Sequence, residues 1–325
     1  MAYTLYLTGP GGGPVRDLTQ LVQTVTWSGQ SNQIARELSV TLAVPRDGSV
    51  EPPALEEGAA LTLMVDGTPR FTGPLVSATT STQSVLVELS ALDNGRFLVG
   101  NEGWYQFSGV AAETAAAAIC GEFGIPVAGL APGGGTVSRK FAGVSLDKII
   151  KTLYTLAAGS SGRRFLARFT GQGALEVVEK PTAATAVIQS TMGVTNTWDI
   201  TGLQNSVAIR TEAGALVTRV EDGGSISRNG RLEHVLIQSD GQDPSAEAQA
   251  WLEDNGLRQT LTVETLGDVR LITGNAVELR DTGSGVSGLF WIDSDTHTWK
   301  NKQYFTKVRL NFRNLMDEAT SGSEV

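Results

Sequence analysis

The sequence of 325 residues has little of several residue types on which common site chemistries depend. Its one cysteine, Cys120, excludes a disulfide framework and a zinc site built on cysteines. Its two histidines, His234 and His297, form no His-Glu-x-x-His, which disfavours a zinc hydrolase. No apolar run approaches the ~18 residues of a transmembrane helix. Residues 1–5 show neither a basic nor an apolar signal region, so we expect no Sec export.

Positive charge is also scarce. Lysine and arginine number 25 against 34 aspartates and glutamates, which gives a formal net charge of −9. An acidic surface repels phosphate backbones and anionic lipid, so we expect no specific nucleic-acid binding and no membrane insertion. Hydrophobic residues make up 41% and charged residues 18%, which is typical of a folded chain and not of a disordered one. At ~150 residues per domain, the length predicts two or three domains.

Apolar and polar residues alternate in two stretches of the chain, one before residue 100 and one after residue 197. Such alternation places one face of a strand in the core and the other in solvent, as in antiparallel sheets. Short strands at this spacing predict a small barrel or sandwich in each stretch. The alternating runs are 38–44, 61–65, 85–89, 207–209, 261–263, 277–279 and 308–312.

The two stretches also resemble each other. Gly58 and Gly274 each precede, by the same offsets, two apolar residues of an alternating strand. An aspartate, a strand holding a phenylalanine and a closing alternating strand then follow in both. The corresponding residues are Leu61 and Val277, Leu63 and Leu279, Asp66 and Asp281, and Phe71 and Phe290. We favour a duplicated barrel, although any meander that begins at a glycine gives a similar pattern.

Helical patterns lie between and within these stretches. The Ala-rich run 111–123 predicts one helix. Ser145 is the expected cap of a second helix, whose apolar stripe contains Leu153. A third helix is expected with Asp243 as its cap and Pro244 as its first residue. Together with a hairpin at 165–178, the first two predict an α+β insert.

Three patterns are weak candidates for chemistry. Ser145 and Lys148 match the Ser-x-x-Lys of penicillin-recognising enzymes, but the Ser-Asp-Asn and Lys-Thr-Gly motifs of those enzymes are missing. Asp293, Asp295 and His297 share one face of a strand, yet Cα atoms ~6.6 Å apart converge poorly on one ion. A scattered Ser-His-Asp triad stays open, but no Gly-x-Ser-x-Gly supports it. We therefore assign no catalytic, cofactor or metal residues.

Several segments carry a resemblance to a known family. They are 222–231, the helix around Trp251, 259–267, 274–277 and 292–299, preceded in the first half by 141–146 entering a helix. In this order they resemble the central baseplate hub proteins of contractile phage tails and related injection systems. That family includes the defective-prophage hub proteins of Gram-positive bacteria and the late-control tail proteins.

The resemblance implies a mainly β fold of two small tudor-like β-barrels with an α+β domain. The expected domains are a first β-barrel at 1–100, an α+β domain at 101–197, a second β-barrel with one inserted helix at 198–316, and a flexible tail at 317–325. Three copies would form a ring that joins the hexameric tail tube to the trimeric central spike. A spike on a separate chain is implied, because this chain has no long β-helical repeat.

The expected role is therefore structural and not enzymatic. The implied partners are two further copies of the chain, the tail tube protein, the central spike protein and other baseplate proteins. DNA would at most pass through the lumen. The implied location is the virion, at the tail baseplate, after assembly in the host cytoplasm. Two alternatives stay open: a carbohydrate-binding or cell-wall-hydrolysing tail protein, and a metal-dependent enzyme using Asp293, Asp295 and His297.

Overall fold

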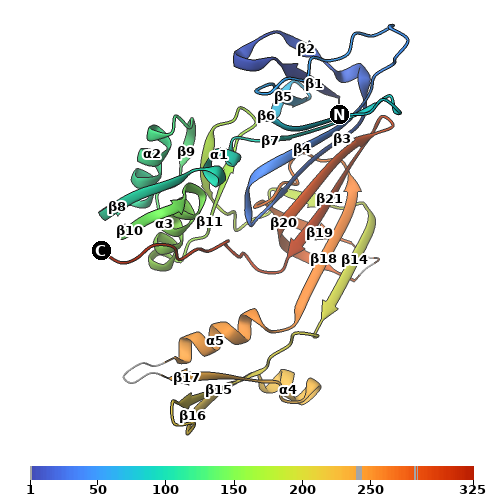
Figure 1. Cartoon of the computed structure of the whole chain (residues 1–325). Coiled ribbons are helices and arrows are strands. Elements are labelled where there is room, and N and C mark those ends of the chain that lie inside the picture. The colour runs from blue at the N-terminus through green and yellow to red at the C-terminus, as the bar shows by residue number, and fades with distance from the viewer. Residues whose placement is uncertain (1, 239–243, 282, 284) are drawn as a thin grey trace. The chain divides into compact units, whose positions relative to one another are not determined.

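The structure is a computed structural model that describes residues 2–238, 244–281, 283 and 285–325 (Figure 1). The chain divides into two compact units. The larger unit comprises Met1–Val194 and Thr262–Val325, and the smaller unit is Thr195–Leu261. In the described part of the chain, no helix has the length and apolar character needed to cross a membrane.

The larger unit begins with a first β region, the strands β1 to β7. All pairs within it are antiparallel, in the spatial order β3-β4-β7-β6-β5-β1-β2. The alternation expected from the sequence is confirmed, since the buried face of β4 carries Leu38, Val40 and Leu42. The strands are β1 (Tyr3–Thr8), β2 (Val15–Asp17), β3 (Val22–Gln30), β4 (Gln33–Ala43), β5 (Ala60–Val65), β6 (Thr68–Thr80) and β7 (Leu86–Leu92), with short 3₁₀ turns at Pro10–Gly12 and Thr19–Leu21.

A second β region closes the chain, in the order β14-β18-β21-β20, with β19 on the other edge of β20 and β13 beside β19. Its strands are β13 (Ala186–Ile188), β14 (Thr191–Asp199), β18 (Arg258–Leu266), β19 (Ala276–Arg280), β20 (Ser287–Lys300) and β21 (Gln303–Asn311). The long strand β20 pairs with β19 through its first half and with β3 through its second half. This pairing joins both β regions into one 13-stranded sheet (Figure 1).

The mainly β class with an α+β part is confirmed, but the sheets in the described residues are not closed barrels. The strands of the two β regions hydrogen-bond to each other through β3 and β20 instead of each closing upon itself. Residues 195–261, which lie within the expected 198–316 domain apart from three residues at its start, form a compact unit.

The α+β part packs three helices against short strands. Its elements are α1 (Gly95–Gly100), β8 (Glu102–Ala111), α2 (Ala112–Glu122), β9 (Val127–Leu130), β10 (Thr136–Ser145), α3 (Leu146–Ser161), β11 (Phe165–Phe169) and β12 (Leu175–Glu179). Both expected helices and the β11–β12 hairpin are confirmed. Ser145 occupies the N-cap position of α3, although its side chain makes no capping hydrogen bond. Ile119, Phe141 and Leu153 lie in the shared core.

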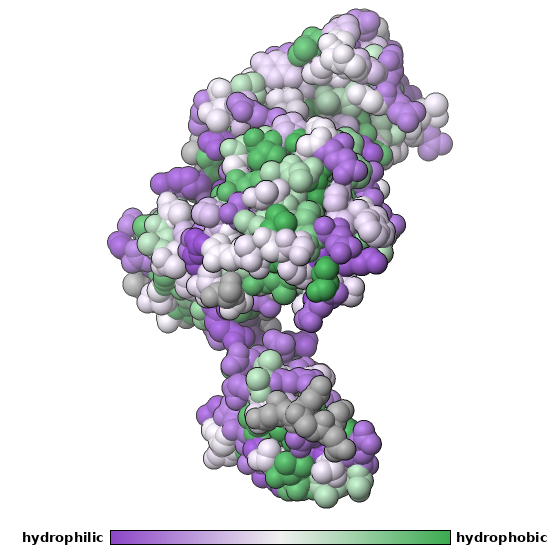
Figure 2. Space-filling model, turned by 90° about the vertical axis from the view of Figure 1, so that its left-hand side faces the viewer, coloured by the Kyte–Doolittle hydropathy of each residue, from purple (hydrophilic) through white to green (hydrophobic). Residues whose placement is uncertain are grey.

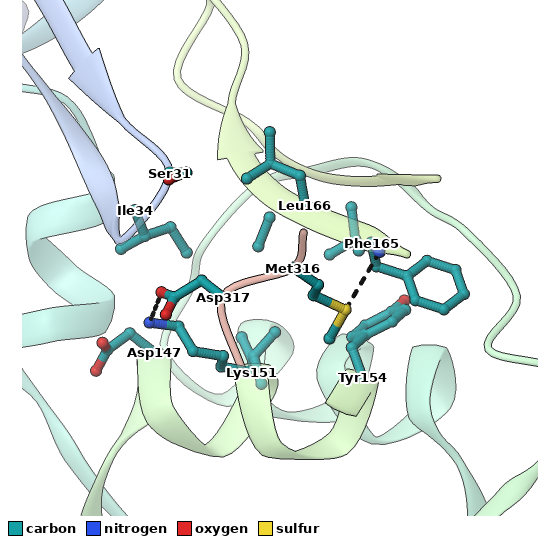
Figure 3. Close-up of a pocket in the computed structure, with 12 residues that line it drawn as sticks. Ser31, Ile34, Asp147, Lys151, Tyr154, Phe165, Leu166, Met316 and Asp317 are labelled. Atoms are coloured by element: carbon teal, nitrogen blue, oxygen red, sulfur yellow. Dashed lines mark hydrogen bonds and ion pairs between the residues drawn. The ribbon is translucent and has the colours of Figure 1, made fainter. Parts of the chain in front are cut away.

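The final segment, expected to be flexible, is placed by the structure against α3 and β10. Asp317 forms an ion pair with Lys151 of α3 (Figure 3). The Ser321 amide donates to the Thr152 hydroxyl at 3.1 Å, and Ser323 and Lys140 exchange backbone hydrogen bonds at 2.9 Å. A cavity of about 40 Å³ beside the ion pair is too small for a substrate. The segment therefore acts as a strap over α3.

The smaller unit is a three-stranded sheet with two helices. Its elements are β15 (Ser206–Thr211), β16 (Leu216–Glu221), α4 (Gly223–Asn229), β17 (Glu233–Gln238) and α5 (Ser245–Asp254). Val207, Ile209, Leu236, Ala248 and Leu252 form its core. Helix α5 is the expected third helix, but Pro244 lies at its N-cap and not at its first helical residue. The expected cap Asp243 lies outside the described residues.

Candidate assembly site

The junction between the two β regions is built around a buried ion pair. Arg36 of β4 donates from Nη1 to Asp295 Oδ1 of β20 at 3.0 Å, and Nη2 contacts the second carboxylate oxygen. The backbone amide and the hydroxyl of Thr273 both donate to Asp295 Oδ1 at 2.7 Å. Asp295 is 1% exposed and Arg36 is 9% exposed. Both oxygens of the carboxylate are therefore engaged by the guanidinium where the two β regions meet.

Aromatic rings enclose this ion pair. The guanidinium carbon of Arg36 lies 4.2 Å from the ring centroid of Trp27 on β3. A side chain at Gly29 would place its Cβ 2.2 Å from Arg36 Nη1, so only glycine leaves room for the arginine to cross β3. His297, fully buried, places Nδ1 2.7 Å from the Tyr304 hydroxyl and Nε2 3.2 Å from Asp295 Oδ2.

Burial alone would raise the pKa of Asp295, but the charge of Arg36 and the hydrogen bonds from His297 and Arg36 outweigh it and hold that pKa well below its usual range. The carboxylate therefore stays ionised. A buried pair of this kind adds little net stability, yet removing one partner typically costs about 3–5 kcal/mol. Because Arg36 of β4 must reach Asp295 of β20, the pair fixes the positions of these two strands on either side of β3.

The metal reading of Asp293, Asp295 and His297 finds no support in this geometry. Arg36 and Thr273 occupy the oxygens of Asp295. Asp293 lies at a bulge in the β20–β21 pairing and accepts from Asn311 at 3.1 Å. Among the described residues, no group of three or more potential ligands lies close enough together to hold a metal ion.

The other candidate residues stay apart from one another. Ser145 precedes α3, and Lys148 is exposed on that helix. His234 belongs to the smaller unit and stacks on Trp251 with ring centroids 3.7 Å apart. Cys120 is buried, and this burial raises the pKa of its thiol to about 11. A thiol that stays protonated in an apolar core packs as a small hydrophobic side chain.

The two β regions repeat the same arrangement of five strands. In chain order, β3, β4, β5, β6 and β7 correspond to β14, β18, β19, β20 and β21, and the spatial order agrees: β3-β4-β7-β6-β5 and β14-β18-β21-β20-β19. Gly58 and Gly274 precede the third strand of each set with φ angles of 86° and 88°. The outer strands differ, since β1 pairs antiparallel to β5 whereas β13 pairs parallel to β19.

A shared irregularity aligns the two sets residue by residue. The pairing of β6 with β7 skips one residue between Leu75 and Ser77, and that of β20 with β21 skips one between Ile292 and Ser294. Residues 200–257, which contain β15 to α5, are inserted between β14 and β18, where the first region has only the tight turn from β3 to β4. Sequence reasoning found the repeat at the two glycines but missed this insertion.

This arrangement is the fold of prophage tail proteins. The 43 kDa tail protein of prophage MuSo2 from Shewanella oneidensis superposes with a TM-score of 0.70 at 15% identity, covering 95% of this chain and 98% of that one. The Escherichia coli c3393 protein, a type VI secretion component with structural similarity to the T4 tail proteins gp27 and gp5, gives a TM-score of 0.52 at 10% identity. That match covers 94% of this chain and 76% of the c3393 chain.

The sequence narrows the class further. The chain belongs to the YQBQ-like family, whose model matches residues 25–311. Among curated relatives, the phage-like element PBSX protein XkdQ of Bacillus subtilis is 24% identical over 323 residues, which covers 94% of this chain and 96% of XkdQ. The resemblance to baseplate hub proteins, drawn from scattered segments, is thereby confirmed.

Proposed function

We propose that this protein is the structural hub of a contractile tail baseplate, a trimeric adaptor that joins the hexameric tail tube to the central spike. The observation that carries the proposal is the repeat of five strands within one chain. Three copies would present six similar β regions in a closed ring. Such a ring matches a sixfold tube on one side and a threefold spike on the other without breaking closed symmetry.

The relatives support a structural role in a tail. XkdQ comes from a phage-like element, the MuSo2 protein is a tail protein, and the c3393 protein is a component of a type VI secretion system. The proposal includes a spike on a separate polypeptide and a location at the tail baseplate of the virion.

The surface of the larger unit is suited to assembly. Figure 2 shows apolar side chains exposed among polar ones on one face of this unit. Large hydrophobic side chains stand exposed on α1 and β8, where Val99 is 53% and Trp104 is 63% exposed. Exposed apolar surface of this kind is typical of contact sites. The net charge of −9 favours passage of DNA through the ring over binding to its wall.

Light scattering on the purified chain, alone and mixed with the tube and spike proteins of the same particle, tests the proposal. We expect a mass of three times 34.3 kDa, reached at lower concentration when the spike is present, because a partner that binds only the trimer stabilises it. A chain that stays monomeric with both partners present would contradict the hub role. Turnover of peptidoglycan by the isolated chain would favour the hydrolytic alternative instead.

A further inference from the structure

Two strand edges, on β14 and on β6, have no partner in the part of the chain that the structure describes. Strand β14 ends the 13-stranded sheet and has β18 as its single neighbour. On β6, the first half pairs with β5 on one edge, and the second half pairs with β7 on the opposite edge. Strand β5 covers its edge of β6 only as far as Pro74. Residues 76–80 of β6 are therefore unpaired on that edge.

Each of these two free edges has a counterpart in the other β region, and the two counterparts pair with each other inside the chain. The second half of β20 corresponds to residues 76–80 of β6, because the shared bulge aligns Ser294 with Ser77. Strand β3 corresponds to β14. In the chain, β3 pairs antiparallel with β20 from Ser294–Gln30 to Lys300–Thr24, directly beyond the end of β19.

Exposure follows this pairing. On the paired strand β20, Asp295, His297 and Trp299 are each at most 2% exposed. On the unpaired counterparts, every residue of 76–80 is exposed, and Met192 of β14 is 60% exposed. In the second β region, the last half of β20 is thus covered by β3. In the first β region, the matching residues of β6 have no strand beside them.

The free edges lack charge and proline, two of the features that keep natural edge strands from pairing. Residues 75–80 of β6 and 191–198 of β14 contain no charged residue and no proline. The bulge at Val76 has its counterpart at Asp293 of β20, a strand that pairs with β3 despite it. Strand β3, which does pair, is likewise free of charge and proline. The composition therefore fits edges that are covered in the assembled protein.

We propose that β14 of one copy adds antiparallel to residues 76–80 of β6 in a second copy, as β3 adds to β20 within the chain. The proposal rests on the trimeric function above and names its lateral contact. Because each copy offers one β14 and one β6, the contact is head-to-tail. Three repeats of it, alternating with the three β3–β20 junctions, close a ring in which every β region has the same two kinds of neighbour.

Disulfide trapping in assembled tail tips tests this contact. Cys120 is buried and does not interfere. Thr79→Cys is combined in turn with Thr191→Cys, Gly193→Cys and Thr195→Cys, a panel that samples the register. The matched control is Ser28→Cys with Thr296→Cys, which are cross-strand partners in the β3–β20 junction and should form a bond within one chain. Each single Cys variant is a second control.

After mild oxidation, we expect at least one pair of the panel to give covalent dimers and trimers but no larger species on a denaturing gel. The control pair should stay at the mass of one chain. A tip that holds three copies by electron microscopy but yields no intermolecular bond with any pair would overturn the β14–β6 contact and leave the hub proposal standing. A tip with a different copy number would overturn both.

Discussion

Two buried aspartates, Asp93 and Asp295, have pKa values shifted in opposite directions by their surroundings. Asp295 meets Arg36, Thr273 and His297, and its pKa lies well below the ordinary value. Asp93, 3% exposed, accepts a hydrogen bond from the Gly95 amide at 2.9 Å. Burial raises the pKa of Asp93 to about 6, and the backbone hydrogen bonds from Gly95 and Arg36 and the Arg36 charge offset the burial only in part.

Replacing Asp295 by asparagine should lower the free energy of unfolding by about 3–5 kcal/mol, because Arg36 then remains buried without its counter-charge. The measurement is chemical denaturation followed by fluorescence. Asp293→Asn is the matched control on the same strand, since Asp293 makes one hydrogen bond to Asn311, and it should cost less. Equal stabilities of Asp295→Asn and the wild type would show that the ion pair does not hold the junction.

Asp93→Asn should stabilise the protein at neutral pH and have little effect near pH 4. The folded protein binds the Asp93 proton more tightly than the unfolded chain, whose aspartates titrate near 3.9, so this group lowers stability as pH rises from about 4 through 6. The gain in the variant should grow over that range towards an upper bound of about 2–3 kcal/mol. Thermal melts between pH 4 and 8 measure it, and a gain that does not depend on pH would contradict the assignment.

The partner of Asp295 could not be predicted from the sequence. The pattern placed Asp295 and His297 on one strand face, and both are buried there. Their role depends on Arg36, which is 259 positions away in the chain. Local periodicity carries no information about such a partner, so the strand was predictable and its ion pair was not.

Among the elements, α3 was the best predicted, because its apolar spacing is long and regular. Leu153 is buried as expected, whereas Leu156, three residues further along α3, is 36% exposed. The strap formed by the last residues was not predictable, since it is held by an ion pair at Asp317 and by backbone amides on threonine hydroxyls. Polar contacts of that kind leave no hydrophobic pattern in the sequence.

Leu153→Ala should lower the free energy of unfolding by about 2–5 kcal/mol, as truncation of a fully buried leucine does. Leu156→Ala removes the same atoms about one turn along the helix, from a position that is 36% exposed, and should cost less than Leu153→Ala. Denaturant midpoints of the two variants give the comparison. Similar losses in both would mean that the exposed face of α3 is covered in solution.

For the whole molecule, the sequence revealed the repeat through Gly58 and Gly274 because both residues adopt positive φ, where glycine is favoured. The sequence did not show which strands of the two β regions correspond or how the regions pair. Residues 200–257 separate β14 from β18, whereas β3 and β4 are joined by a two-residue turn, so the matching strands do not align by spacing. The junction of β3 with β20 likewise joins distant segments, and it turns two expected barrels into one sheet.

The central claim is that three copies of this chain, each carrying two similar β regions, form the ring between tube and spike. A cryo-electron microscopy map of the assembled tail tip tests it most directly, because copies and β regions are counted in the same density. The account predicts three copies, with first and second β regions alternating around the axis. One copy or six copies per tip, or three copies whose β regions do not alternate, would contradict it.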